Sequence, residues 1–137
     1  MGYYVTFGKS TVKFKVENVK KIIKAIKDYN KTVPDNDKIL YTHSNDIKSI
    51  FRDMDFEITK SGKYYRIEYY ISEKLGDQEN YLPVIAPFME DGFIHMIGED
   101  GNHWKWKFQK GRFATYSGRV IFDDEFHISI KDDKVIH

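Results

Sequence analysis

The sequence predicts an α+β domain in which two α-helices pack on one face of a mostly antiparallel β-sheet, with elements in the order ββααβββββ. Three observations predict it. Apolar and polar residues alternate near both ends of the chain, two stretches between them have helical spacing, and aromatic residues make up 16% of the 137 residues. A chain of this length buries a core without metals or disulfides, so we expect one domain spanning residues 1–137.

The N-terminal third predicts a hairpin followed by a helix. Alternating apolar residues in 3–7 and 12–16 flank Gly8-Lys9, which is a suitable turn. A helix then starts after Asn18 as cap, with one apolar stripe formed by Val19, Ile22, Ile23 and Ile26. The other side of this helix carries a stripe of lysines, namely Lys20, Lys24, Lys27 and Lys31.

The next segments predict a loop, a second helix and a further hairpin. Residues 31–37 contain Pro34 and read as an exposed loop, and Ser44 or Asn45 caps a shorter helix with Ile47, Ile50, Phe51 and Met54 on its buried side. From Phe56 onward the apolar residues recur at every second position, as in a strand, and Ser61-Gly62 forms the turn between two strands. Residues 81–88 form either a short helical turn or an extended connector, because Pro83 and Pro87 prevent a long helix.

Two hairpins rich in aromatic residues follow. Across a four-residue loop at residues 99–102, antiparallel pairing sets Ile97 opposite Trp104, His95 opposite Trp106 and Phe93 opposite Phe108. Across the turn Lys110-Gly111, Phe108 meets Phe113 and Trp106 meets Thr115. The two tryptophans then share one buried face. A strand at 119–122, an acidic turn at Asp123-Asp124 and a last strand at 126–130 complete the sheet.

This pairing predicts two candidate binding surfaces. On the sheet face opposite the tryptophans, Ile94 and Met96 pair with Lys107 and Lys105, and an apolar pair on an uncovered face marks a binding surface. Tyr116 extends that surface. We slightly favour this sheet surface over the lysine stripe of the helix as the binding site, because lysines on the exposed side of a helix usually only contact solvent. The predicted partner-binding residues are Lys20, Lys24, Lys27, Lys31, Ile94, Met96, Lys105, Lys107 and Tyr116.

Motifs for catalysis, metals and cofactors are missing from the sequence. The chain has no cysteine, and its five histidines never recur at i, i+3 or i+4 spacing. Gly8-Lys9-Ser10-Thr11 resembles the end of a phosphate-binding loop, but Tyr3 stands where that loop needs glycine. His95 is either a hydrogen-bonded core imidazole or a base at the end of a pocket. We therefore predict no catalytic residue, no metal site and no cofactor.

Charge and hydropathy limit the partners. A formal charge of +1 fits neither a polyanionic DNA mimic nor a strongly basic nucleic-acid binder. No apolar segment reaches the length that spans a bilayer, so we expect a cytoplasmic protein with no membrane contact.

Residues 82–94, together with Gly98-Glu99-Asp100-Gly101 and the stretch 104–108, resemble a C-terminal segment of small proteins from prophages and mobile elements of Gram-positive bacteria. The resemblance, within residues 81–122, implies a phage protein that inhibits host defence by binding, as anti-CRISPR proteins do. The expected partner is then a host or bacterial protein, including a nucleoprotein complex such as an RNA-guided nuclease. The sequence is also compatible with a homodimer. A toxin-neutralising immunity protein is the alternative, and a small nuclease or nucleotide hydrolase that uses His95 with carboxylates is the third hypothesis.

Overall fold

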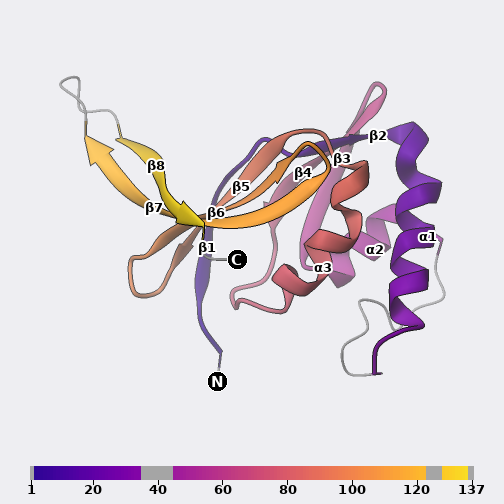
Figure 1. Cartoon of the computed structure of the whole chain (residues 1–137), viewed down its shortest axis with the longest axis horizontal. Helices are drawn as coiled ribbons and strands as arrows, with labels where there is room; N and C mark the ends of the chain where they lie inside the picture. The colour runs from indigo at the N-terminus through magenta and orange to yellow at the C-terminus, as the bar shows by residue number, and fades with distance from the viewer. Residues whose placement is uncertain (1, 35–44, 123–127, 136–137) are drawn as a thin grey trace.

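A computed structural model describes residues 2–34, 45–122 and 128–135. Strands form a five-stranded sheet in the order β1-β5-β6-β7-β8 and a three-stranded sheet in the order β2-β4-β3, with antiparallel pairing throughout (Figure 1). The predicted α+β class is confirmed. The strands are β1 (Val5–Ser10), β2 (Lys13–Lys15), β3 (Phe56–Ser61), β4 (Tyr64–Tyr70), β5 (Gly92–Gly98), β6 (His103–Gln109), β7 (Arg112–Phe122) and β8 (Ile128–Val135). The helices are α1 (Val19–Asn30), α2 (Ile47–Asp53) and α3 (Gln78–Ile85), with 3-10 turns at Val16–Asn18 and Ala86–Phe88.

The N-terminal segment belongs to both sheets. β1 pairs with β5, and the chain then continues into β2, which pairs with β4. The predicted hairpin at Gly8-Lys9 is therefore wrong, because this dipeptide forms a β-bulge within β1 instead of a turn. Between the two strands, the Thr11 amide donates to the Phe93 carbonyl at 2.8 Å and the Ile67 amide donates to the Val12 carbonyl at 3.0 Å. These bonds join the two sheets through one continuous backbone.

The helices α1 and α2 form where the apolar spacing predicts them. Ile22 and Ile26 are fully buried on α1, and Ile47, Ile50 and Phe51 are buried on α2. The cap of α2 is Asp46, one residue later than Asn45, and its carboxylate accepts from the Ser49 hydroxyl at 2.9 Å.

A third helix, α3, covers the core in addition to the two predicted helices. It is short and contains Pro83, so the alternative of a short helical turn at residues 81–88 is confirmed over the extended connector. Leu82 and Ile85 are buried. Gln78, also buried, donates to the Met54 carbonyl at 3.1 Å, which ties the start of α3 to the end of α2.

The core lies between the two sheets and the helices. Trp106 is its centre, with ring centroids 6.1 Å from both Phe56 and Tyr70 of the three-stranded sheet. Burying aromatic rings of this size supplies much of the hydrophobic stabilisation of a small domain. The five-stranded sheet therefore has one face turned to the core and one face turned away from the helices.

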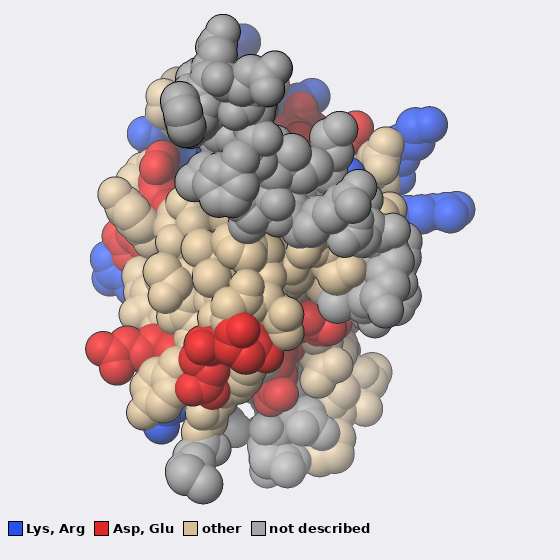
Figure 2. All heavy atoms as spheres, turned by 90° about the vertical axis from the view of Figure 1, so that its left-hand side faces the viewer, with Lys and Arg blue, Asp and Glu red and all other residues tan. Residues whose placement is uncertain are grey.

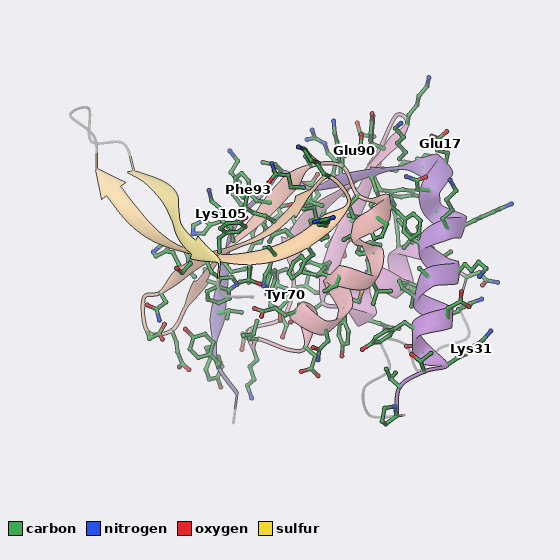
Figure 3. All side chains as sticks on the ribbon, viewed as in Figure 1. Glu17, Lys31, Tyr70, Glu90, Phe93 and Lys105 are labelled. Atoms are coloured by element: carbon green, nitrogen blue, oxygen red, sulfur yellow. The ribbon has the colours of Figure 1, made fainter. Side chains whose placement is uncertain are left out.

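The pairing of β5 with β6 differs from the prediction by one residue. Ile94 pairs with Trp106 and Met96 with Trp104, so these residues share the buried face, whereas Phe93 pairs with Lys107 and His95 with Lys105 on the outer face. Figure 3 shows Phe93 and Lys105 on the outer side of the sheet and Tyr70 on the core side. The predicted pairing of β6 with β7 is confirmed, with Phe108 opposite Phe113 and Trp106 opposite Thr115.

The hairpin loop explains the shift. The Gly98 amide donates to the Asn102 carbonyl at 2.8 Å and closes a loop of three residues, Glu99-Asp100-Gly101, in which Gly101 has φ of +83°. A three-residue hairpin loop ends in a residue with positive φ, and glycine adopts that φ without strain. Because side chains alternate along a strand, a shift of one residue moves every β5 side chain to the opposite face.

The strand expected at residues 119–122 is the second half of β7, which pairs with β8 from Tyr116 to Phe122. This two-stranded part of the sheet extends away from the helices (Figure 1). The predicted acidic turn at Asp123-Asp124 and the start of the last strand at 126 lie outside the described residues.

Candidate functional site

The outer face of the five-stranded sheet gathers cationic and aromatic side chains. Register places Lys9 beside His95, His95 beside Lys105, and Lys105 beside Tyr116, so these four form one row across β1, β5, β6 and β7. No outward-facing residue of these strands within the described range 5–118 carries a carboxylate. The outward residues are Thr6, Lys9, Phe93, His95, Ile97, His103, Lys105, Lys107, Gln109, Arg112, Ala114, Tyr116 and Gly118.

Two lysines of this outer face lie over aromatic rings. The Lys105 ammonium is 4.6 Å from the centre of the Phe93 ring, and the Lys107 ammonium is 4.8 Å from the centre of the Tyr116 ring. Such contacts hold the ammonium close to an exposed ring face. Phe93 and Tyr116 are both half-buried.

A groove of about 680 Å³ lies at one end of the outer face, between β6 and β7. Ala114 is the smallest side chain in its lining and separates Arg112 from Tyr116 on β7. Across β6, Ala114 pairs with Lys107. The remaining lining residues are Gln109, Lys110 and Phe113, so among the described residues the groove lining contains three cations and no carboxylate.

His95 and His103 form a pair on the outer face. Their rings stack with centroids 5.1 Å apart, and Nε2 of His95 lies 2.9 Å from Nδ1 of His103. Burial, the nearby His103 and the Lys105 ammonium lower the pKa of His95 to about 4, so His95 is neutral at pH 7. Which of the two ring nitrogens donates depends on the tautomers of the rings.

Charge is distributed unevenly along β5 and β6. The turn between them carries Glu99 and Asp100, whereas at the other end of β6 the turn to β7 carries Lys110 and is followed by Arg112, the first residue of β7. Figure 2 shows acidic side chains gathered on the lower half of the end of the molecule toward which β7 and β8 extend. The Tyr3 hydroxyl donates to the Asp100 carboxylate, and this bond raises the pKa of Tyr3 to about 12 and lowers that of Asp100.

The lysine stripe of α1 is exposed but partly neutralised. Lys24 and Lys31 both contact Asp28, at 2.7 Å and 3.8 Å, and Lys27 donates to the Asn45 side chain. The helix lies on the opposite side of the molecule from the β7–β8 ribbon (Figure 1). The two predicted surfaces are therefore separate.

The structure corrects the predicted site at two residues. Ile94 and Met96 are fully buried against the tryptophans, so the expected exposed apolar patch is wrong. Lys105, Lys107 and Tyr116 do share the outer face. His95, which was expected opposite Trp106 in the core, joins them there with Phe93 and His103.

Several residues of the site were missed at the sequence level. The pattern Glu99-Asp100-Gly101 is itself a signal for a three-residue loop, and reading it so would have placed Phe93 and His95 outside. The contact of His95 with His103 follows from the same register. Nothing in the local sequence indicates that Ala114 forms the floor of a groove.

The surroundings of His95 contain imidazole and ammonium groups. The hydrolase hypothesis requires a pocket that brings His95 together with at least two carboxylates, whereas the groups beside it are His103 and Lys105. Within the described residues, no three histidine, aspartate or glutamate side chains come together in a way that could hold a metal ion. The helices in that same part of the chain are too short or too polar to cross a bilayer.

No protein-family model, no curated protein and no solved structure matches this chain. The resemblance to mobile-element proteins thus stays a prediction.

Proposed function

We propose that this chain is a non-enzymatic binding protein that inhibits a host defence complex, and that it binds through the outer face of the five-stranded sheet. One observation carries the proposal. Across β1, β5, β6 and β7 this face presents lysine, arginine, histidine and aromatic side chains, and none of the outward positions of these four strands within residues 5–118 carries a carboxylate. Cationic side chains combined with aromatic rings are also what proteins use to bind single-stranded nucleic acid.

The charge of the face favours a partner with an anionic surface. An RNA-guided nuclease holds its heteroduplex in a positively charged channel, and a cationic sheet would be repelled by the channel wall. The favourable contact is instead with the nucleic acid of the complex. We therefore propose an RNA-guided nuclease loaded with its guide as the target, and blocking of that guide as the mode of inhibition.

The groups around His95 support binding over catalysis. A general base needs a partner that orients it and a substrate-sized site beside it. His95 contacts His103 at 2.9 Å, and its low pKa makes it a weak base. A structural role for the histidine pair, in holding the surface in shape, fits these contacts.

The proposal is tested by interference in bacteria. Cells carrying an RNA-guided nuclease and a matching plasmid lose the plasmid, and co-expression of this protein should restore its retention. The variant Lys105→Glu/Lys107→Glu should abolish the protection, because it reverses two central charges of the outer face. The matched control Lys20→Glu/Lys27→Glu makes the same charge change on α1 and should leave protection intact.

A panel of several nuclease types makes the test decisive. Absence of protection against every type would contradict the proposal, and so would equal protection by both double variants. Restored growth of cells that express a secreted or contact-delivered toxin, without any effect on plasmid loss, would assign the protein to the immunity class instead. Thermal melting of each variant establishes that the loss of function is not a loss of fold.

A further inference from the structure

We infer that the groove between β6 and β7 binds a segment of single-stranded RNA. This inference deepens the proposed function, and the choice of RNA over other polyanions rests on it. The groove provides three elements that such a ligand requires: a small-residue floor, cations for phosphate, and an aromatic ring face for a base. Each comes from residues on neighbouring strands or their turn.

The floor of the groove is created by one small side chain. Ala114 stands between Arg112 and Tyr116 on β7 and pairs with Lys107 on β6, so three long side chains surround a methyl group. The resulting volume, about 680 Å³, lies in the range of pockets that take small organic ligands. A nucleotide unit is of that size, and the groove is open along the sheet, so a strand can continue beyond it.

The cations are arranged for a phosphodiester. Lys107, Lys110 and Arg112 line the groove from β6, from the turn and from β7. The turn holds Lys110 in a left-handed conformation with φ of +52°, and the Asp91 carboxylate accepts from its amide at 2.9 Å. Asp91 is not among the described residues that line the groove. Arginine binds phosphate through two parallel hydrogen bonds, and lysine adds a point charge.

The ring faces are suited to unpaired bases. Tyr116 lines the groove, and the Lys107 ammonium rests 4.8 Å from its ring centre. A base that stacks on Tyr116 replaces this ammonium, which then turns to the adjoining phosphate. Phe93, two strands away on β5 at roughly 10 Å, offers a second ring covered by the Lys105 ammonium. The outer face thus has two aromatic rings that each lie under a lysine ammonium, Phe93 under Lys105 and Tyr116 under Lys107.

This arrangement distinguishes a single strand from other anions. A duplex keeps its bases stacked on each other, so it cannot use the two ring faces. An acidic peptide matches the lysines but has no planar group for Tyr116. Gln109 also lines the groove, and its amide both donates and accepts, as a ribose 2′-hydroxyl requires.

The inference is tested by fluorescence anisotropy with a labelled twelve-nucleotide oligouridine RNA and the full-length protein. Tyr116→Ala should weaken binding by about 10- to 100-fold, as loss of one stacked base does, and Tyr116→Phe should retain it. Ala114→Leu fills the groove without changing charge and should weaken binding by about 10-fold or more. Thr59→Leu, which adds the same apolar side chain at an exposed position of β3 in the other sheet, should stay within about twofold of the unmodified protein.

Salt and competing ligands complete the experiment. Three phosphate contacts predict that log affinity falls with log salt concentration with a slope of about −2, and Arg112→Glu should make that slope shallower. Single-stranded DNA, duplex RNA and a polyglutamate peptide should each bind more weakly than the RNA. If Ala114→Leu does not fold, the binding measured for Tyr116→Ala, Tyr116→Phe and Arg112→Glu still tests the inference.

The outcomes separate this inference from the proposed function. Equal binding of any competing ligand, or RNA binding that is unchanged in Tyr116→Ala and Arg112→Glu, would overturn the inference. Absence of RNA binding with inhibition that still depends on Lys105 and Lys107 would overturn the inference and leave the proposed function standing. RNA binding without inhibition of any nuclease would support the inference and refute the proposed function.

Discussion

His95 and His103 are hydrogen-bonded to each other through ring nitrogens 2.9 Å apart, on the outer face of the five-stranded sheet. The pair links β5 to the start of β6 and lies between the acidic turn at one end of these strands and the cationic groove toward the other. Gly8 contacts it from β1, since a Cβ atom there would be 2.3 Å from Nδ1 of His95. Three strands therefore meet at this pair, and its protonation affects both the fold and the charge of the surface.

We expect the free energy of unfolding to decrease as the pH falls from 6.5 to about 4. The pKa of His95 is lowered from 6.5 to about 4 in the folded protein, so the unfolded chain binds more protons in this range and acid favours unfolding. One pKa unit corresponds to about 1.4 kcal/mol, and screening at a half-exposed site reduces the total to an effect on the order of 1 kcal/mol. Urea denaturation at several pH values measures it.

The control for this pH dependence is His95→Gln, which keeps a hydrogen-bonding side chain but does not titrate. Its stability should vary less between pH 6.5 and 4 than that of the unmodified protein. Carboxylates whose pKa is lowered, such as Asp28 and Glu57, lose their contribution progressively below about pH 5, but they do so in both proteins, so the difference between the two pH profiles reports His95. An identical pH profile for both proteins would show that His95 is not the group responsible.

Gly8→Ala should displace the His95 ring and destabilise the fold. The added methyl group would overlap the ring, which must leave its position beside His103. Overpacking of this kind costs about 1–3 kcal/mol. Adding His95→Ala in the Gly8→Ala background should recover part of the loss, because it removes the group that clashes. A double-mutant cycle from chemical denaturation measures this coupling, and strictly additive effects would contradict the contact.

Trp106→Ala should destabilise the protein by about 3–5 kcal/mol, which is enough to unfold a domain of typical stability. The ring is fully buried, contacts Phe56 and Tyr70, and its Nε1 donates to Glu79 at 3.3 Å. Trp106→Phe keeps much of the packing and should cost less. Thermal melting checks both variants, and a Trp106→Ala protein with an unchanged melting temperature would disprove the central position of the ring.

Met96→Asp and Tyr116→Asp should have opposite effects on folding. Met96 is fully buried opposite Trp104, so an aspartate there places an unpaired charge in the core. Tyr116 lies on the outer face, so its aspartate variant should fold and lose binding. Circular dichroism with a binding assay distinguishes them. A folded Met96→Asp protein would instead support the pairing of β5 with β6 that the sequence predicts, in which His95 lies opposite Trp106 and Met96 is on the outer face.

Local patterns in the sequence were sufficient for much of the secondary structure. The stripe of Ile22 and Ile26 has a helical period, which predicts α1 without knowledge of its neighbours. Lys110-Gly111, both with positive φ, closes a two-residue hairpin of the kind that glycine-containing turns favour, and this determines the pairing of β6 with β7. The α+β class follows from these elements together.

Only the tertiary structure decided which strands lie side by side and which side chains share a face of the sheet. Two residues at the bulge, Gly8 and Lys9, read as a turn, but β1 obtains its hydrogen bonds from β5, more than eighty residues later in the chain. The sequence by itself determined that Lys105, Lys107 and Tyr116 lie near one another, because β6 and β7 are joined by a tight turn. The side of the sheet on which they meet Phe93 and His95 depends on one residue of register between β5 and β6. The loop pattern Glu99-Asp100-Gly101 is compatible with the observed register, and the burial of Ile94 and Met96 against the core selects it.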